Sequence, residues 1–171
     1  MGNPAYDKAL KLLARRDHFR AELAEKLRTR GFSDDDIEAA LDRLAGLGLL
    51  DDERLAGRFA ELRAVDRGWG PRRLELELRK RGVDRNLAER AARLGDELHR
   101  RALATAVRKV AARAPDGWWR LFQRRERLIS SLTGRGFDVD EAIAAVGTLA
   151  AELESDAHET HDELGDPGQL P

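Results

Sequence analysis

The stretch "RTRGFSDDD" at residues 28–36 has two counterparts later in the chain, "RKRGVDRN" at 79–86 and "TGRGFDVDE" at 133–141. Each copy joins Arg-Gly to Phe or Val and then to Ser or Asp. Leucines stand eight and four residues before each glycine: Leu23 and Leu27 before Gly31, Leu74 and Leu78 before Gly82, and Leu128 and Leu132 before Gly136. This recurrence predicts three copies of one structural unit.

Each copy has the pattern of a tight corner between two helices. Residues four apart share a helix face, so each leucine pair predicts a core stripe, and the glycine suits a left-handed helix end. In the first copy Ser33 is the predicted N-cap of the next helix, with Asp36 at the capping-box position and Phe32 packing on Ile37. The third copy has Phe137, Asp138 and Glu141 in these places, whereas the second has Val83 and Asp84 but no acid at Leu87.

Further apolar stripes flank each corner and predict a helix on either side of it. The stripes before the leucine pairs are Tyr6, Leu10 and Leu13; Leu55, Phe59 and Leu62; and Leu103, Val107, Val110 and Ala114. The stripes after the glycines are Ile37, Leu41 and Leu44; Leu87, Ala91 and Leu94; and Ile143, Val146 and Leu149. The sequence therefore predicts an all-α protein of nine helices in three tandem, helix-turn-helix-like repeats.

We expect these repeats at residues 4–50, 51–95 and 96–154, stacked in an elongated, curved array. A three-helix unit of about 50 residues is marginal alone, so neighbouring repeats should complete each core. The segment 155–171 is acidic, ends in Gly and Pro and has no sustained stripe, so we expect a disordered tail.

Composition limits the class of protein. The chain has no cysteine, which excludes disulfides and thiolate metal sites. No apolar run reaches the roughly 20 residues that a membrane span needs, and the N-terminus lacks the pattern of a signal peptide. These features favour a soluble, cytoplasmic protein, which we expect to be a monomer without membrane contact.

The net charge of −1 conceals a strongly basic middle. Residues 63–136 hold 20 Lys and Arg against 9 Asp and Glu, whereas residues 151–171 hold seven acids and no Lys or Arg. Such a distribution favours a polyanionic or acidic partner for the middle of the chain. The alternative is that arginine simply solubilises exposed helix faces.

We take twelve basic residues as candidates for contact with a partner or DNA, on the basis of charge. The helix over 97–114 should carry its cations opposite its apolar stripe, and two further groups crowd the neighbouring helices. The candidates are Arg72, Arg73, Arg79, Lys80, Arg81, Arg101, Arg108, Lys109, Arg113, Arg124, Arg125 and Arg127. Trp69, Trp118 and Trp119 lie among them, as core residues between repeats or, less favoured, as interface anchors.

No constellation predicts catalysis, a metal or a cofactor. His158 and His161 have His-x-x-His spacing inside the expected tail, which does not match the zinc motif His-Glu-x-x-His. The acids at 34–36 and 51–53 stand at expected helix starts, where capping explains them better than paired catalytic carboxylates do. There is no phosphate-binding glycine loop and no nucleophile elbow.

Four stretches together resemble the RecX family of bacterial regulators of the RecA recombinase: "RDHFRAELAEKLRTRGF", "GLLDDERLAGRFAELR", "RGWGPRRLELELRKRGV" and "LISSLTGRGFDVDEAI". The resemblance covers about residues 6–153 and implies three tandem three-helix repeats and a non-enzymatic role. It also implies binding in the groove of the RecA–single-stranded DNA filament, with inhibition of recombinase, ATPase and co-protease activities in DNA repair, recombination and the SOS response.

Two positions depart from the family pattern. Phe19 stands where a Ser usually caps the second helix against Glu22, and we expect Asp17 to replace that cap. Leu55 replaces the usual Phe after Asp-Asp-x-Arg, a core exchange of little consequence.

A stand-alone helix-turn-helix-like protein that binds single- or double-stranded nucleic acid is the alternative function. Three-helix units with a tight second turn are typical of such modules. The acidic segment "DDDIEAALDRL" at residues 34–44, however, would repel phosphates if it were a recognition helix.

Overall fold

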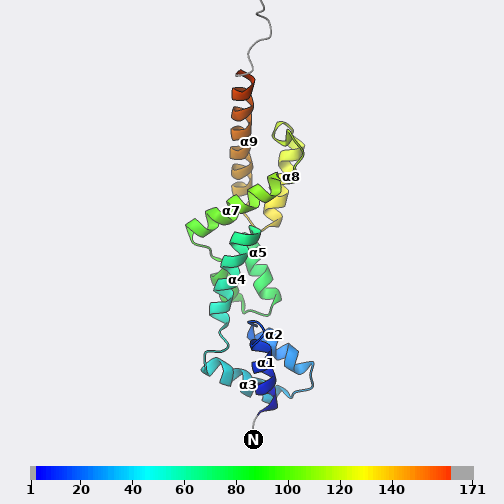
Figure 1. The fold of residues 1–171 in the computed structure, drawn as a ribbon, viewed down its shortest axis with the longest axis vertical. Coiled ribbons are helices and arrows are strands. Elements are labelled where there is room, and N and C mark those ends of the chain that lie inside the picture. The colour runs from blue at the N-terminus through cyan, green and yellow to red at the C-terminus, as the bar shows by residue number, and fades with distance from the viewer. Residues whose placement is uncertain (1–2, 163–171) are drawn as a thin grey trace, which may run out of the picture.

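The computed structural model describes residues 3–162, with side chains up to residue 156, and is an elongated stack of helices along one axis (Figure 1). The described residues contain nine α-helices, one 3-10 turn and no strand, which confirms the all-α class. The helices are α1 (Pro4–Leu13), α2 (Arg20–Arg28), α3 (Asp34–Gly46), α4 (Asp52–Arg67), α5 (Pro71–Lys80), α6 (Arg85–Ala92), α7 (Asp96–Ala111), α8 (Phe122–Gly134) and α9 (Val139–Asp162), with the 3-10 turn η1 (Trp118–Arg120) before α8.

The three Arg-Gly corners have the same backbone geometry. Gly31, Gly82 and Gly136 have φ angles of 83°, 79° and 94°, in the left-handed region that favours glycine. In each corner the amide after the glycine donates to the carbonyl five residues earlier: Phe32 to Leu27, Val83 to Leu78 and Phe137 to Leu132, at 3.5, 3.2 and 3.4 Å. This is the Schellman pattern at a helix C-terminus, and it confirms the predicted corners.

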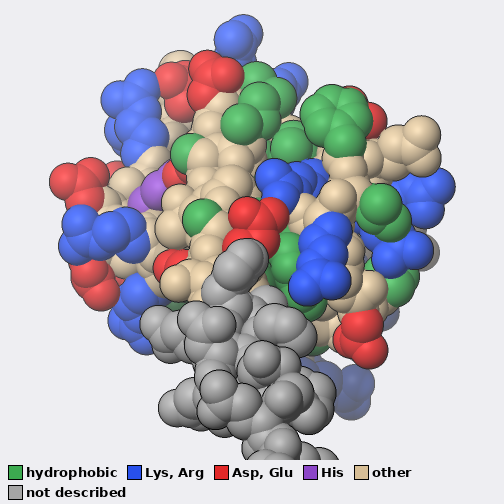
Figure 2. Space-filling model, turned by 90° about the horizontal axis from the view of Figure 1, so that it is seen from above, with side chains coloured by type: hydrophobic (Ala, Val, Ile, Leu, Met, Phe, Trp, Pro, Cys, Tyr) green, Lys and Arg blue, Asp and Glu red, His purple; other side chains and the backbone are tan. Residues whose placement is uncertain are grey.

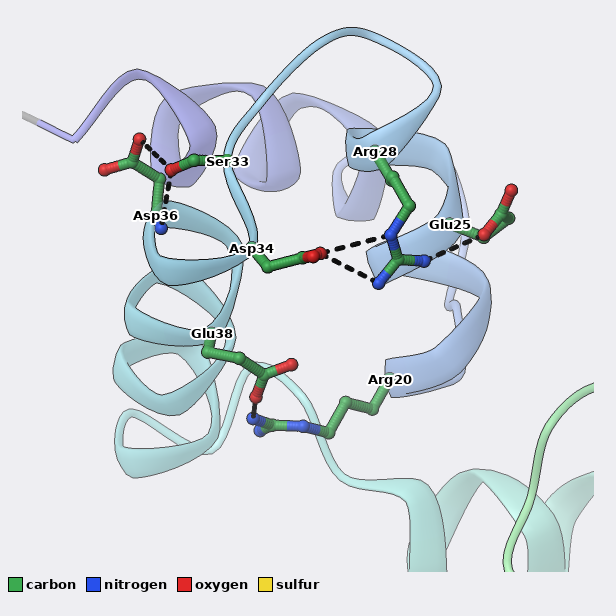
Figure 3. Close-up of polar contacts among 7 residues, drawn as sticks. All are labelled: Arg20, Glu25, Arg28, Ser33, Asp34, Asp36 and Glu38. Atoms are coloured by element: carbon green, nitrogen blue, oxygen red, sulfur yellow. Dashed lines mark hydrogen bonds and ion pairs between the residues drawn. The ribbon is translucent and has the colours of Figure 1, made fainter.

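Polar contacts hold the first corner together, as Figure 3 shows. The Ser33 hydroxyl accepts from the Asp36 amide at 3.2 Å, which confirms the N-cap. The Asp36 carboxylate, however, accepts from the Ser33 hydroxyl at 2.7 Å, instead of from the Ser33 amide as in a reciprocal capping box. Arg28 bridges the corner, with ion pairs to Asp34 at 3.0 Å and Glu25 at 2.9 Å.

Alanines line the buried faces of most first and third helices of the repeats, which corrects the predicted stripes in part. The stripe of α3, with Ile37, Leu41 and Leu44, is buried as predicted, and so are Val110 in α7 and Val146 in α9. In α4 the buried residues are Ala56, Ala60 and Ala64, whereas the predicted stripe residue Leu62 is 62% exposed. The same shift occurs at Ala5 and Ala9 in α1, Ala88 and Ala92 in α6, Ala102 and Ala106 in α7, and Ala142 and Ala150 in α9. Small side chains let helices approach closely, and the larger apolar residues then flank the contact.

Neighbouring repeats share their cores, as predicted. Phe19, which precedes α2, is 3% exposed and belongs to the cluster of Ala56, Leu78, Val83 and Ala88 in the second repeat. Ala60, Ala64, Leu74 and Ala92 of the second repeat belong instead to the large cluster of the third repeat. The middle repeat therefore completes its core with residues from both sides, which couples the three units into one stack.

The start of α2 corrects the predicted role of Asp17. Phe19 occupies the N-cap position without a side-chain cap bond, and Asp17 instead pairs with Arg58 of α4. The Arg20 amide donates to the Asp52 carboxylate at 2.8 Å, so the cap of α2 comes from the first residue of α4. Tertiary structure here supplies a cap that lies 32 residues away in the sequence.

We expect Asp52→Ala to lower the free energy of unfolding by about 1 kcal/mol, because the Arg20 amide loses its acceptor. Burial raises the pKa of Asp52, and the Arg20 amide partly opposes this. Because the pKa of Asp52 is higher in the folded than in the unfolded protein, its protonated form stabilises the fold. This contribution is complete below the unfolded-state pKa and is lost as the pH rises through the folded-state pKa. Asp52→Asn keeps an acceptor without the charge, so urea denaturation at neutral pH should find it close to wild type. Equal losses in both variants would contradict the cap.

The end of α9 also differs from the prediction. The helix continues to Asp162, so residues 155–162 of the expected disordered tail are helical. Ala and Glu favour helix in this stretch, and the first helix breaker after residue 154 is Gly165. The rest of the expected tail, residues 163–171, lies outside the described residues.

Candidate basic binding surface

The second and third repeats meet where α4 crosses α7. Gly68 ends α4 with a φ of 63°, and a Cβ atom on it would lie 2.6 Å from the Ala106 nitrogen. Together with Ala64 and Ala106, which are buried, this glycine lets the two helices approach to backbone contact. The close approach brings cations at the end of α4 next to those of α7.

The third corner caps the start of α5. The Gly70 amide donates to the Arg135 carbonyl at 2.8 Å, and the Arg72 amide donates to the Gly136 carbonyl at 3.2 Å. These bonds satisfy amide groups that have no partner within α5. They also place Arg135 beside the end of α4.

Two hollows that share Lys109 lie along this junction, and we call them together the basic groove. The first, of about 420 Å³, is lined by Val65, Asp66, Arg101, Ala104, Thr105, Arg108 and Lys109. The second, of about 360 Å³, is lined by Arg63, Arg67, Trp69, Lys109, Arg113 and Arg135. The groove therefore combines cations from α4, from α7 and from the third corner.

A third hollow, at the junction of the first two repeats, shares Arg63 with the basic groove. It has a volume of about 360 Å³ and is lined by Arg16, Asp17, Phe19, Glu22, Leu55, Phe59, Arg63 and Arg81. Here carboxylates balance the cations, because Glu22 pairs with Arg81 at 2.9 Å and Asp17 pairs with Arg58. The cations at this junction are thus balanced by acids, unlike those at the junction of the second and third repeats.

The structure separates the twelve candidate cations into three groups. Arg101, Arg108, Lys109 and Arg113 lie together in the basic groove, with no carboxylate partner among the described residues. The five candidates of the second repeat form ion pairs: Arg72 with Asp138, Arg73 and Lys80 with Glu77, Arg79 with Glu75, and Arg81 with Glu22.

The last three candidates lie at the start of α8. Arg124 and Arg127 line a separate hollow of about 370 Å³ with Leu121, Phe122 and Gln123. Arg125 pairs with Glu154 at 2.6 Å and donates to the Trp119 carbonyl. Viewed end-on in Figure 2, basic and hydrophobic side chains lie side by side on this end of the molecule.

Sequence reasoning missed three cations of the groove. Arg63 and Arg67 are four residues apart, and this spacing already indicated one shared helix face. Arg135 belongs to the third Arg-Gly corner, and no sequence signal places its side chain beside α4. Burial lowers the pKa of Arg135, and the positive charge of Arg113 lowers it further.

The three tryptophans have different environments. Trp118 is 3% exposed and belongs to the core of the third repeat, as favoured from the sequence. Trp119 and Trp69 are partly buried against the same core. Trp69 also faces the groove, and the Arg63 and Arg73 guanidinium carbons lie 5.7 and 5.2 Å from its ring centre.

Among the described side chains, no three or more His, Cys, Asp or Glu are arranged so that they could hold a metal ion. The side chains of His158 and His161 lie outside the described part of the chain. None of the described helices is long and apolar enough to cross a membrane.

Fold and surface together define a helical tandem-repeat protein with a basic groove at one repeat junction. The family models for the first and second three-helix domains of RecX match residues 5–44 and 51–91. The chain belongs to the RecX family.

Individual relatives agree with this membership. The regulatory protein RecX of Ectopseudomonas mendocina is 41% identical over 135 residues, which cover 77% of this chain and 85% of the relative. That of Halorhodospira halophila is 39% identical over 142 residues, covering 81% and 84%. The crystal structure of RecX from Lactobacillus salivarius superposes with a TM-score of 0.73 at 28% identity, over 85% of this chain and 94% of the other.

Proposed function

We propose that this chain binds the RecA–single-stranded DNA filament and inhibits the recombinase, ATPase and co-protease activities of RecA. Membership in the RecX family supports this role, and the elongated stack of repeats suits a protein that lies along a filament (Figure 1). The observation that supports the choice of contact site is that Arg101, Arg108 and Lys109 line one groove. None of the three forms an ion pair with a described residue.

The basic groove is the proposed contact surface. A surface arginine in an ion pair must lose that partner before it binds another, whereas Arg101 and Arg108 form no ion pair with a described residue. Complementary charge also speeds association with an acidic or polyanionic partner. The alternative of an independent nucleic-acid reader is less favoured, because Asp34, Asp35 and Asp36 are all exposed at the start of α3.

DNA-stimulated ATP hydrolysis by RecA tests this proposal. The wild-type chain should inhibit at substoichiometric amounts, and the triple variant Arg101→Glu, Arg108→Glu, Lys109→Glu should need roughly tenfold more protein, a change that corresponds to about 1.4 kcal/mol. The matched control reverses three cations that already have ion-pair partners, Arg90, Arg93 and Arg100, and should inhibit like wild type.

Two outcomes would count against the proposal. No inhibition by equimolar wild-type chain would reject the RecA role, and equal weakening by the control would reject the groove as the contact. DNA binding by the triple variant is measured separately. If it is lost while inhibition persists, DNA contact plays no part in the mechanism.

A further inference from the structure

The second hollow of the groove is lined by several cations, and no Asp or Glu side chain balances their charge there. Five cations line it together with Trp69, and no carboxylate lines it. Arg72 and Arg73, which lie nearby in α5, are instead paired with Asp138 and Glu77 at 2.7 and 3.2 Å. The absence of a compensating acid is therefore a property of this hollow and not of the whole junction.

Backbone carbonyls at the end of α4 hold two of these cations. The Arg135 guanidinium donates to the Arg67 carbonyl at 2.7 Å, and the Lys109 ammonium donates to the Asp66 carbonyl. The last carbonyls of a helix carry partial negative charge, so they attract cations. This accounts for two cations, but Arg63, Arg67 and Arg113 have no carboxylate partner among the described residues.

Cations that line the hollow also repel one another. Arg113 lies close enough to Arg135 to lower the pKa of that partly buried guanidinium, in addition to the effect of burial. Two like charges, one from the turn after α7 and one from the third corner, thus oppose each other across the junction. An anion between them would turn this repulsion into attraction.

We propose that this hollow is a binding site for a phosphoryl anion, which bridges the second and third repeats. Guanidinium groups donate paired hydrogen bonds that match phosphate oxygens. Five cations exceed what one carboxylate would balance, which favours a multiply charged anion. The Trp69 ring is already in contact with Arg63 and Arg73, so the hollow offers charge instead of a free stacking surface for a base.

The site goes beyond the proposed RecA role, because it concerns the free protein and needs no RecA. Its ligand could be a free phosphate compound or the backbone phosphates of a nucleic-acid strand. Lys109 also lines the first hollow with Arg101 and Arg108, so a strand could place successive phosphates along the groove.

Thermal unfolding with pyrophosphate tests the site directly. A ligand that binds only the folded state raises its stability, so saturating pyrophosphate should raise the Tm by about 5 °C. Sodium chloride at equal ionic strength is the necessary comparison, because salt alone screens the repulsion between Arg113 and Arg135. An equal rise with chloride would overturn the proposal.

Arg113→Gln separates an anion site from general charge effects. This variant removes one cation from the repulsive pair, so without pyrophosphate it should be at least as stable as wild type. Its affinity for pyrophosphate should fall about tenfold or more, as expected for loss of a charged hydrogen bond. Arg100→Gln is the control, since Arg100 lies in α7, pairs with Glu97 at 2.7 Å and does not line the hollow. Wild-type affinity in Arg113→Gln would overturn the proposal, whatever the result with RecA.

Competition between pyrophosphate and a short oligothymidylate identifies the source of the phosphate. If the ligand is a strand, pyrophosphate displaces the oligonucleotide, and Arg113→Gln lowers the slope of log K against log salt concentration by about 1. Pyrophosphate binding with unchanged oligonucleotide binding in Arg113→Gln would assign the site to free phosphate compounds. If Arg113→Gln binds both pyrophosphate and the oligothymidylate with wild-type affinity, the hollow is not a phosphate-binding site.

Discussion

Gly136→Ala is expected to lower the free energy of unfolding by about 3 kcal/mol or more. The φ angle of 94° is in a region that costs an alanine about 1–2 kcal/mol. A Cβ atom here would also collide with the backbone of Arg73, whose Cα would lie only 3.0 Å away. Displacing α5 to relieve this would break the bonds from the Gly70 and Arg72 amides, each contributing about 1 kcal/mol.

Gly31→Ala is the matched control for this variant. Gly31 has a similar φ of 83°, but no atom lies within 4 Å of the position that its Cβ would take. Only the conformational cost of about 1–2 kcal/mol therefore remains. Urea denaturation of both variants measures the difference, and equal losses would show that the contact between the third corner and α5 contributes nothing to stability.

Phe19→Ala is expected to lower the free energy of unfolding by about 3–5 kcal/mol, the usual range for a buried phenylalanine. Phe19 is 3% exposed and joins the first repeat to the core of the second. Phe19→Ser would restore the residue that the family pattern has at this position. Since a cap contributes only about 1 kcal/mol and Asp52 already caps α2, the serine variant should still lose about 2–4 kcal/mol.

Phe122→Ala is the control for the loss of an aromatic ring. Phe122 is 74% exposed, so its removal should change stability by no more than about 0.5 kcal/mol. Denaturant curves for the four proteins test the order of stability. A serine variant as stable as wild type would show that capping, and not burial of the ring, decides the residue at position 19.

The corners were predictable because their chemistry is local. A glycine at positive φ, two leucines on one helix face and a capping residue all act within about ten residues of chain, so the pattern around Gly31, Gly82 and Gly136 predicted three equivalent turns. The buried faces were less predictable. Leu62 is more hydrophobic than Ala60 or Ala64, but the alanines are buried because α4 packs closely against its neighbours.

The candidate site was predicted only in part. The periodicity of α7 grouped Arg101, Arg108 and Lys109 on one helix face, and all three line one hollow. It could not show that Arg72 and Arg81 form ion pairs with Asp138 and Glu22, because these partners are 66 and 59 residues away in the sequence. Whether a cation is free or paired depends on which helices meet, and charge counts along the chain do not contain this information.

By itself, then, the sequence determined the helical class, the three Arg-Gly corners and the family, since these depend on short-range backbone preferences and on residue order. Only the tertiary structure decided which residues join the repeats and which cations remain unpaired. Gly68, Gly70 and Gly136 allow backbones to touch across the junction, and this contact brings Arg67, Lys109, Arg113 and Arg135 around one hollow. The physical reason is that close packing and electrostatic compensation depend on distances in space between segments that are far apart in the chain.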